Sequence, residues 1–403
     1  MNTVADWDPR SPDMQTDPIG AYDVMRQRCP FAHSDALQLS VLRHADVMRV
    51  LMDPETFSNQ ASRRVSVPNS MDPPEHGLYR SIIEPYFDAM RMAQFAPLCE
   101  ALCEKLVMQL PMDDEIELMS ALAHPFSLQM QCAFLGWPDT MHQPLHQWVR
   151  HKNAAVLSGD HDDLAAVAAE FDETIRTLLT SRREAGDEAP DDATTRLMRE
   201  TVGGRPLTEA EIVNILRNWT VGELGTMASS VGIIADYLAT HPQLQQDLRD
   251  QPSLIGAAND EILRIHAPLI SNRRRATRPV CLGTETLQAG DRLSVIWASA
   301  NRDEAVFGDP DEFRLDRDPA LNLLYGAGIH ACPGAPLARL ELRAIIETLL
   351  SQTIGIARIP GRPPSADTYP SSGYCTVPLH ITRRLPKPTT AAPAQPRLQL
   401  RCA

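Results

Sequence analysis

The chain has 403 residues, 43% of them hydrophobic and 22% charged, and its formal net charge is −14. This length suits a large hydrophobic core in one or two domains, and the acidic balance argues against non-specific nucleic-acid binding. No run approaches the ~20 apolar residues of a membrane helix, and residues 1–18 lack the apolar centre of a signal peptide, so we expect a soluble, cytoplasmic protein.

The N-terminal half of the chain reads mostly as helices and loops. Residues 1–40 are rich in Pro and Asp and predict an irregular arm with a short helix over 21–28. A strand over 37–42 and a helix after His44 follow. Amphipathic periodicity then predicts helices between 95 and 137 and over 140–183, before an acidic loop at 184–192.

The next predicted element is a long helix. Thr208 and Glu211 form the T-x-x-E pattern of a capping box at its start, and Pro242 lies just past its end. Gly222 and Gly225 lie in its middle, where each glycine weakens a helix by roughly 1 kcal/mol relative to alanine. We expect the close approach of a cofactor to compensate.

The stretch 324–339, LYGAGIHACPGAPLAR, sets Cys332 in a glycine-spaced loop ahead of an apolar helical run. Gly326 allows a tight turn and the close approach of a flat ligand. A thiolate just before a helix N-terminus is stabilised by unpaired backbone N–H groups and by the helix dipole, which lower its pKa and favour metal ligation. The alternative is a small buried hydrophobic residue, the commoner role of a single cysteine.

The pattern G-x-G-x-H-x-C-x-G from Gly326 to Gly334 resembles the haem-binding loop of the cytochrome P450 family. The resemblance implies that Cys332 is the axial thiolate of haem b and that His330 faces a haem propionate. Tyr325 occupies the position of the family's usual Phe at the haem edge, so its hydroxyl needs a partner.

Three further positions match the family's propionate-binding pattern. His76 and Arg80 lie four residues apart after D-P-P-E, so they project from one helix face. Arg274 begins an R-x-A-T match and is the choice for a second propionate contact, with Arg273 and Arg275 as near alternatives.

An E-x-x-R pair, Glu261 and Arg264, precedes the cysteine by about 70 residues. It resembles the family's buried ion pair under the haem loop. Glu312 stands where many relatives have the third partner, an arginine, which leaves Arg314 or Arg317 for that role.

The middle of the long helix, Gly222 to Thr226, resembles the family's oxygen-activation motif with Thr226 as its alcohol. The usual acid is replaced by Gly225, and Glu223 lies three residues before the threonine on the same helix face. Three roles for Glu223 remain open: a proton relay that replaces the missing acid, an anchor for a polar substrate, or a solvated helix residue.

The resemblance implies a mainly α fold with a smaller β-rich lobe, in which the haem lies between the long helix and the cysteine loop. It spans one domain, 1–385, followed by a Pro-rich tail, 386–403, expected to be disordered. The implied pocket residues are Leu269, Ile270 and Gly222, together with Tyr374 at the tip of a β-hairpin predicted over 371–381.

The implied activity is that of a bacterial-type monooxygenase that inserts one oxygen atom from O2 into a small, mostly apolar substrate. Electrons would come from a separate ferredoxin and its NAD(P)H-dependent reductase, docked near Arg80, Arg339 and Arg343. Arg63 and Arg64 are either a handle for a substrate carboxylate or two solvated loop arginines. We expect a monomer.

Two rival functions remain, and the missing acid beside Thr226 motivates the first of them. One is a peroxide-driven or rearranging haem-thiolate enzyme, and the other is a haem-thiolate protein that binds ligands without turnover.

Overall fold

The computed structural model describes residues 6–61, 65–111, 113–158, 161–367, 369 and 371–383. Most of these residues are helical. The α-helices are α1 (Pro12–Thr16), α2 (Pro18–Arg28), α3 (His44–Met52), α4 (Glu75–Ile83), α5 (Ala89–Met108), α6 (His124–Leu135), α7 (His142–Ser158), α8 (His161–Ala185), α9 (Ala193–Leu197), α10 (Glu209–Thr240), α11 (Pro242–Asp250), α12 (Ile255–Ile265), α13 (Trp297–Ala300), α14 (Glu304–Phe307) and α15 (Ala335–Gln352).

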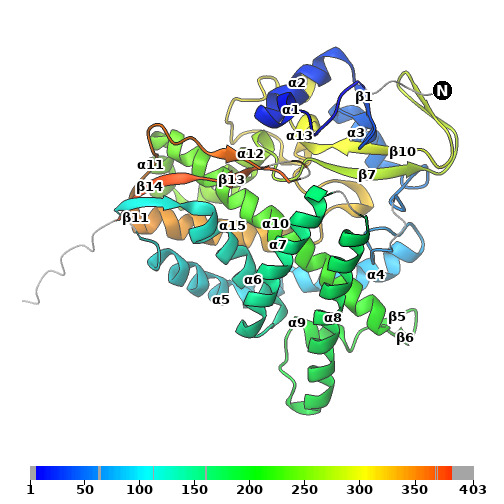
Figure 1. Cartoon of the computed structure of the whole chain (residues 1–403), viewed down its shortest axis with the longest axis horizontal. Coiled ribbons are helices and arrows are strands. Elements are labelled where there is room, and N and C mark those ends of the chain that lie inside the picture. Colours follow the sequence, from blue (N-terminus) through cyan, green and yellow to red (C-terminus); the bar gives the residue numbers. More distant parts are fainter. Residues whose placement is uncertain are drawn as a thin grey trace, which may run out of the picture.

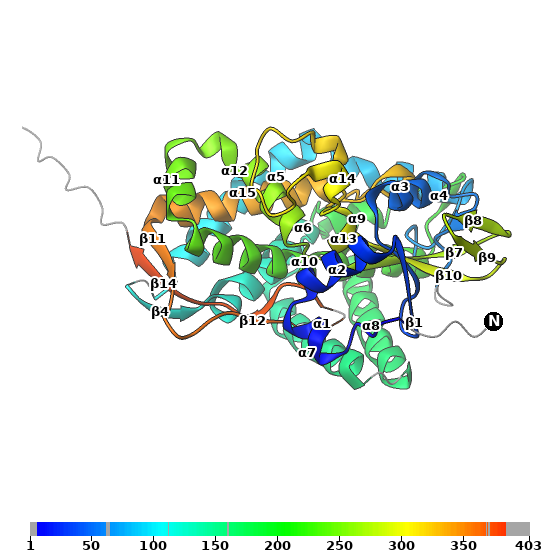
Figure 2. The same ribbon diagram turned by 90° about the horizontal axis from the view of Figure 1, so that it is seen from above.

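The strands are short and are divided among several sheets. They are β1 (Phe31–Ser34), β2 (Gln38–Val41), β3 (Phe57–Ser58), β4 (Asp114–Glu117), β5 (Thr201–Val202), β6 (Arg205–Pro206), β7 (Ser271–Ala276), β8 (Val280–Leu282), β9 (Glu285–Leu287), β10 (Arg292–Ile296), β11 (Thr353–Arg358), β12 (Ser365–Ala366), β13 (Tyr374–Thr376) and β14 (Pro378–Arg383). The largest sheet has the order β1-β2-β10-β7-β3, and a second has the order β11-β14-β4. Figure 2 shows these two sheets at opposite ends of the molecule.

The long helix α10 crosses the middle of the molecule (Figure 1). Its start is the predicted capping box, because Glu211 N–H donates to the Thr208 side chain and the Glu211 side chain accepts from the Thr208 N–H. Its central residues Met227, Ala228 and Val231 belong to a core cluster that also contains apolar residues of α5 and α15. The mainly α fold with a smaller β part is confirmed.

The short helix expected over 21–28 is confirmed as part of α2, but the rest of the N-terminal arm is more regular than its composition predicted, with α1 and β1 on either side of it. Helix α2 is held by buried charges: Arg26, 1% exposed, pairs with Asp23 and Glu304, and Arg302 pairs with Asp23 at 2.6 Å. These contacts join segments far apart in the chain, so local composition does not reveal them.

The β-hairpin predicted over 371–381 is also wrong. Strand β13 pairs with β12, whereas β14 pairs with β11 and β4, because Val377 separates two strands that enter different sheets. The Pro-rich tail over 386–403, with Arg63 and Arg64, lies outside the described residues.

Candidate functional site

The loop around Cys332 is a tight turn that ends at the first residue of α15. Cys332 N–H donates to the Tyr325 carbonyl at 2.8 Å, and Ala331 N–H donates to the Gly328 carbonyl at 3.1 Å. Gly326 and Gly328 have φ angles of 70° and 69°, in the left-handed region that favours glycine. A Cβ at Gly328 would lie 2.6 Å from the Leu51 carbonyl oxygen, so no larger residue fits there without a shift.

Cys332 is an exposed free cysteine in this structure, although many protein atoms surround its thiol. Burial raises its pKa, while the backbone N–H groups of Gly334 and Ala335 and the charge of Arg80 oppose that rise. The expected lowering of the pKa is therefore wrong for the free thiol, because desolvation outweighs the helix terminus. Coordination to a metal deprotonates such a thiol outright.

A cluster of basic side chains lies beside this loop. The rings of His76 and His330 have centroids 4.3 Å apart, and Arg80 donates to the Ala331 carbonyl at 2.5 Å. Burial first, and then the positive charges of His76, Arg274 and Arg80, lower the pKa of His330 to about 3. Arg274 is 5% exposed, and burial lowers its pKa to about 10.

Anions balance this cluster only in part: Arg80 pairs with Glu84 at 2.8 Å, and the charge of Asp72 acts on His76 and Arg274. Within the described part of the chain, His76, His330 and Arg274 form no ion pair, and the Nε2 atoms of both histidines are buried without a hydrogen-bond partner. Buried polar groups are normally satisfied, so unpaired donors next to buried arginine indicate an acidic ligand. Two carboxylates suit His76, His330 and Arg274, which lie beside Arg80, itself paired with Glu84.

The register of β7 separates Arg274 from its neighbours. Arg273 is exposed and Arg275 is only partly buried, whereas Arg274 points inward. Successive side chains of a strand face opposite sides, so these three arginines are not equivalent.

Tyr325 begins the same loop and has an unsatisfied polar group as well. Its hydroxyl is buried and has no partner among the described residues, and the same holds for the Trp297 indole N–H. The Arg339 guanidinium lies over the Tyr325 ring, 4.6 Å from its centroid. The aromatic ring is thus held by a cation, while its hydroxyl stays unsatisfied.

The middle of α10 borders open space. A Cβ at either Gly222 or Gly225 would meet nothing within 4 Å, although α10 is otherwise largely buried. The Thr226 hydroxyl is exposed and donates to the Gly222 carbonyl at 2.6 Å. These glycines leave room for a ligand and are not required by packing within the chain.

Glu223 turns away from solvent. It is 9% exposed, so the reading of a solvated helix residue is wrong. Its carboxyl faces that of Glu341 on α15, which is 0% exposed. Burial raises the pKa of both groups, and the charge of Glu223 raises that of Glu341 further. Sequence reasoning missed Glu341; the signal was an acid within the apolar run of the last long helix.

The E-x-x-R pair is buried as expected. Arg264 contacts Glu261 at 2.8 Å and donates to the Asn301 carbonyl at 2.9 Å. Arg317 supplies the third partner, at 2.9 Å from Glu261, while the Arg314 side chain pairs with Asp316 instead. The structure therefore decides between the two candidates.

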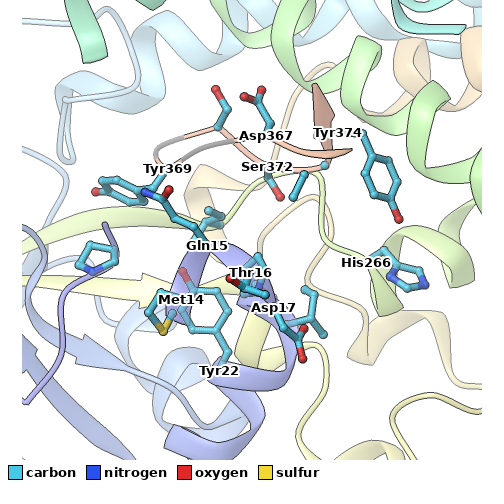
Figure 3. Close-up of a pocket in the computed structure, with 18 of the residues that line it drawn as sticks. Met14, Gln15, Thr16, Asp17, Tyr22, His266, Asp367, Tyr369, Ser372 and Tyr374 are labelled. Carbon is cyan, nitrogen blue, oxygen red and sulfur yellow. The ribbon is translucent and has the colours of Figure 1, made fainter. Parts of the chain in front are cut away.

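A separate cavity of about 340 Å³ lies between the N-terminal helices and the C-terminal strands. Ile270 and Tyr374 line it, and Figure 3 shows Tyr374 on one side of the cavity and Tyr22 and Tyr369 on the other. The Tyr374 hydroxyl donates to Asp236 on α10 at 2.8 Å. Leu269 is 39% exposed and lies outside this lining.

The comparison with known proteins decides the family. The sequence model of the family described as Cytochrome P450 matches residues 119–352, more than half of the chain. The chain belongs to the cytochrome P450 family. In this cytochrome P450, the fold agrees with haem b held by an axial cysteine thiolate. The unpaired basic groups of His76 and His330 agree with the carboxylates that haem b carries.

Named relatives support the same class. Cyclomarin C epoxidase CymV of Salinispora arenicola is 31% identical over 330 residues, which cover 78% of this chain and 82% of the relative. Linalool 8-monooxygenase of Pseudomonas putida is 30% identical over 336 residues, which cover 77% of this chain and 81% of the relative. This cytochrome P450 is a bacterial-type monooxygenase, and substrate and O2 are its reactants.

Solved structures agree with the fold. Cytochrome P450 CYP109Q5 from Chondromyces apiculatus has a TM-score of 0.83 and 27% identity, covering 95% of this chain and all of that chain. A mutant of P450 EryK in complex with erythromycin B has a TM-score of 0.82 and 25% identity. The match covers 94% of this chain and 98% of that chain. Among the described residues of this cytochrome P450, no helix is long and apolar enough to cross a membrane.

Proposed function

We propose that this chain inserts one oxygen atom from O2 into a small, mostly apolar organic substrate, with Cys332 as the axial ligand of its haem. The observation that carries the proposal is the basic cluster of His76, His330, Arg80 and Arg274 beside that thiol, in which both histidine Nε2 atoms are buried without a partner. When bound, the haem supplies the iron at which dioxygen is activated. The protein residues bind and orient it and control protons.

Each residue has a proposed task. His76, His330, Arg80 and Arg274 hold the two propionates through charge-assisted hydrogen bonds. Tyr325 and Gly326 border the flat face of the ligand from the cysteine loop.

The oxygen side is formed by α10. Thr226 presents an exposed hydroxyl there, and Gly222 leaves open space beside it. The Glu223 carboxyl lies three residues away and is buried, which raises its pKa to about 7 and favours its protonated form. A protonated carboxyl near a hydroxyl can pass a proton to it and so replace the acid that Gly225 lacks.

The pocket for the substrate is proposed next to Leu269 and Ile270, at the junction of α12 and β7, with Tyr374 nearby. The exposed side chain of Leu269 and the buried one of Ile270 support a mostly apolar lining. CymV is named an epoxidase and the Pseudomonas relative a monooxygenase of linalool, which supports an organic substrate without defining it.

Electrons are proposed to come from a ferredoxin and its NAD(P)H-dependent reductase. Arg343 is exposed on α15, and Arg339 is half-exposed and paired with Asp260. Arg80 contributes less to such a surface, because its guanidinium binds Glu84 and the Ala331 carbonyl. An acidic partner suits the other two arginines.

The remaining proposals concern the whole molecule. We propose that residues 1–385 form one domain, since the core clusters combine N-terminal, central and C-terminal elements, and that the protein acts as a monomer. A cytoplasmic location is supported by the seven cysteines in the described part of the chain, which are all free thiols.

The first test is the ferrous carbon monoxide difference spectrum of purified protein. We expect a Soret band at the position typical of thiolate-ligated haem, lost in Cys332→Ala and kept in the control Cys281→Ala, whose cysteine is exposed elsewhere. A band typical of histidine-ligated haem in the wild type would overturn the assignment of Cys332.

A peroxide-driven reaction is the second candidate, favoured by Gly225 in the acid position. Turnover assays of one protein preparation distinguish the O2-dependent reaction from the peroxide-driven one. Product with peroxide but none with ferredoxin, reductase and NAD(P)H would favour the second candidate.

A further inference from the structure

The cavity between the N-terminal helices α1 and α2 and the chain around β13 has the size of a small-molecule site. Its volume is about 340 Å³, within the range of about 300–1,000 Å³ that is usual for such sites. Figure 3 shows Met14 and Tyr22 on one side of it and Ser372 and Tyr374 on the other. Its apolar lining comes from several elements and includes Met14, Ile19, Ile233, Ile270 and Ala298. A space of this size between apolar walls suits a small organic molecule.

The cavity is distinct from the space around the cysteine loop. Cys332 and Thr226 both belong to the described part of the chain, and neither lines it. Ile233, which does, lies seven residues after Thr226 on α10, about 10 Å farther along the helix axis. Ile270 lines the cavity, whereas Leu269, the residue before it, does not. A ligand of this cavity would therefore not contact the thiol.

Hydrogen bonds fix the walls of the cavity. The Ser372 hydroxyl donates to the Ala267 carbonyl at 2.6 Å, and the Ser229 hydroxyl of α10 donates to the Ser372 carbonyl at 2.7 Å. The Ile270 carbonyl accepts from the Trp297 N–H at 2.9 Å. These bonds tie the chain before β13 to α10 and to the chain before β7. The site is therefore largely pre-formed, and a ligand loses little affinity to the ordering of its walls.

One buried polar group of the lining lacks a hydrogen bond. Tyr22 is 2% exposed and lines the cavity, and its hydroxyl forms no hydrogen bond with any residue that the structure describes. Burial raises the pKa of this hydroxyl, so the group stays protonated and can donate. Buried hydroxyl groups are normally satisfied, which indicates a ligand that carries a hydrogen-bond acceptor.

The charges of the lining disfavour an anionic ligand. No Lys or Arg is among the described residues that line the cavity, whereas Asp17 and Asp367 are. The Asp17 carboxylate accepts from the Gly20 N–H at 3.0 Å, so the N-terminus of α2 already balances its charge. Burial lowers the pKa of His266 to about 4, so this imidazole is neutral near pH 7. A neutral ligand therefore fits the lining better than a carboxylate or an amine.

We propose that this cavity is a second ligand site, apart from the haem site, for a neutral and mostly apolar small organic molecule with a carbonyl oxygen that accepts from the Tyr22 hydroxyl. The proposal does not depend on the monooxygenase function, because it rests on residues outside the cysteine loop.

The probe para-bromoacetophenone tests the site, because it is neutral and mostly apolar and carries one carbonyl acceptor. Phenylimidazole is first added to the haem-loaded protein until the Soret band stops shifting, so that the space beside the iron is filled. Isothermal titration calorimetry should then still show the probe binding to one site. Tyr22→Phe should weaken this binding about two- to tenfold, the effect of one neutral hydrogen bond. The control Tyr86→Phe should not, because the Tyr86 hydroxyl bonds Glu200 outside the cavity.

A second pair of variants tests the location of the site. Ile19 lines the cavity on α2, so Ile19→Trp should fill part of it and weaken probe binding by about tenfold or more. Val24, on the same helix, is 47% exposed and lies outside the lining, so Val24→Trp should bind the probe as the wild type does. Thermal unfolding, measured first, verifies that each variant is folded. In wild-type crystals grown with the probe, anomalous scattering should place the bromine inside the cavity.

Three results would overturn the proposal. Loss of probe binding once phenylimidazole is bound would mean that the probe occupies only the space at the iron. Equal affinity of the wild type and Ile19→Trp would mean that the probe binds elsewhere. No probe binding by the wild type would mean that water alone satisfies Tyr22.

Failure of the proposed function is distinguishable from these results. A protein that binds no haem would show no Soret band and would refute that function. Probe binding that Ile19→Trp weakens and Val24→Trp keeps would still support the second site in such a protein.

Discussion

The imidazole rings of His76 and His330, from α4 and from the cysteine loop, lie 4.3 Å apart at their centroids, and both Nε2 atoms are buried without a partner. Two basic rings so close to Arg80 and Arg274 repel one another, which contributes to the low pKa of His330. Such an arrangement persists because the surrounding fold imposes it, and an acidic ligand relieves it.

Removal of the Arg274 charge should therefore weaken haem binding but stabilise the haem-free protein. We expect Arg274→Met to speed haem loss by roughly tenfold or more, because a charged hydrogen bond contributes about 1.5–3 kcal/mol. The same change should stabilise the haem-free protein, since it removes a buried charge that forms no ion pair among the described residues. Haem transfer to an acceptor protein and urea unfolding of the haem-free form measure the two effects.

Arg273→Met is the matched control, because Arg273 is exposed on the same strand. Equal haem loss in both variants would contradict the assignment of Arg274 to a propionate.

The ion pair under the loop gives a prediction about stability. Arg317→Ala should lower the free energy of unfolding by about 2 kcal/mol, because it removes a charged hydrogen bond to the buried Glu261 carboxylate. Arg314→Ala should change it by less than about 0.5 kcal/mol, because that side chain pairs with Asp316 at the surface. Urea unfolding measures the free energy of unfolding of both variants. A larger decrease in Arg314→Ala than in Arg317→Ala would contradict the prediction.

The acid at Glu223 should leave a signature in the pH dependence of stability. Burial raises its pKa from 4.5 to about 7, so the folded state holds a proton that the unfolded state releases. The free energy of unfolding then falls as pH rises from about 4.5 to about 7, by up to about 3 kcal/mol. Glu223→Gln should remove this fall, so its stability gain over the wild type grows between pH 5 and pH 8.

Urea unfolding at several pH values between 5 and 8 measures this gain. Parallel curves for wild type and Glu223→Gln would mean that Glu223 has an ordinary pKa in the folded protein. Glu347→Gln, on α15, serves as the control, because Glu347 is only partly buried.

Two glycines should respond oppositely to alanine. Gly328→Ala should destabilise the protein by about 1–2 kcal/mol, because φ is 69° and the new Cβ meets the Leu51 carbonyl. Gly225→Ala should stabilise the haem-free protein by about 1 kcal/mol, since the position is helical and open. Thermal unfolding of the haem-free variants checks both; a destabilising Gly225→Ala would show that the space beside α10 is filled by the chain.

The sequence by itself determined the features that depend on neighbours along the chain. The glycine spacing around Cys332 sets a turn whose backbone angles only glycine adopts easily, and the Thr208/Glu211 pattern starts α10 at the predicted residue. Ordered motifs along the chain also indicated the family before the comparison did. Backbone conformation and helix capping are local, so a single stretch of sequence is sufficient to specify them.

Only the tertiary structure decided which distant side chains meet. It selected Arg317 over Arg314 as the partner of Glu261, turned Arg274 inward between two outward arginines, and brought Glu341 to Glu223. It also separated β13 from β14 into different sheets. These outcomes depend on strand register and on how helices pack across the core, where many weak contacts between remote segments act together, and no local pattern encodes them.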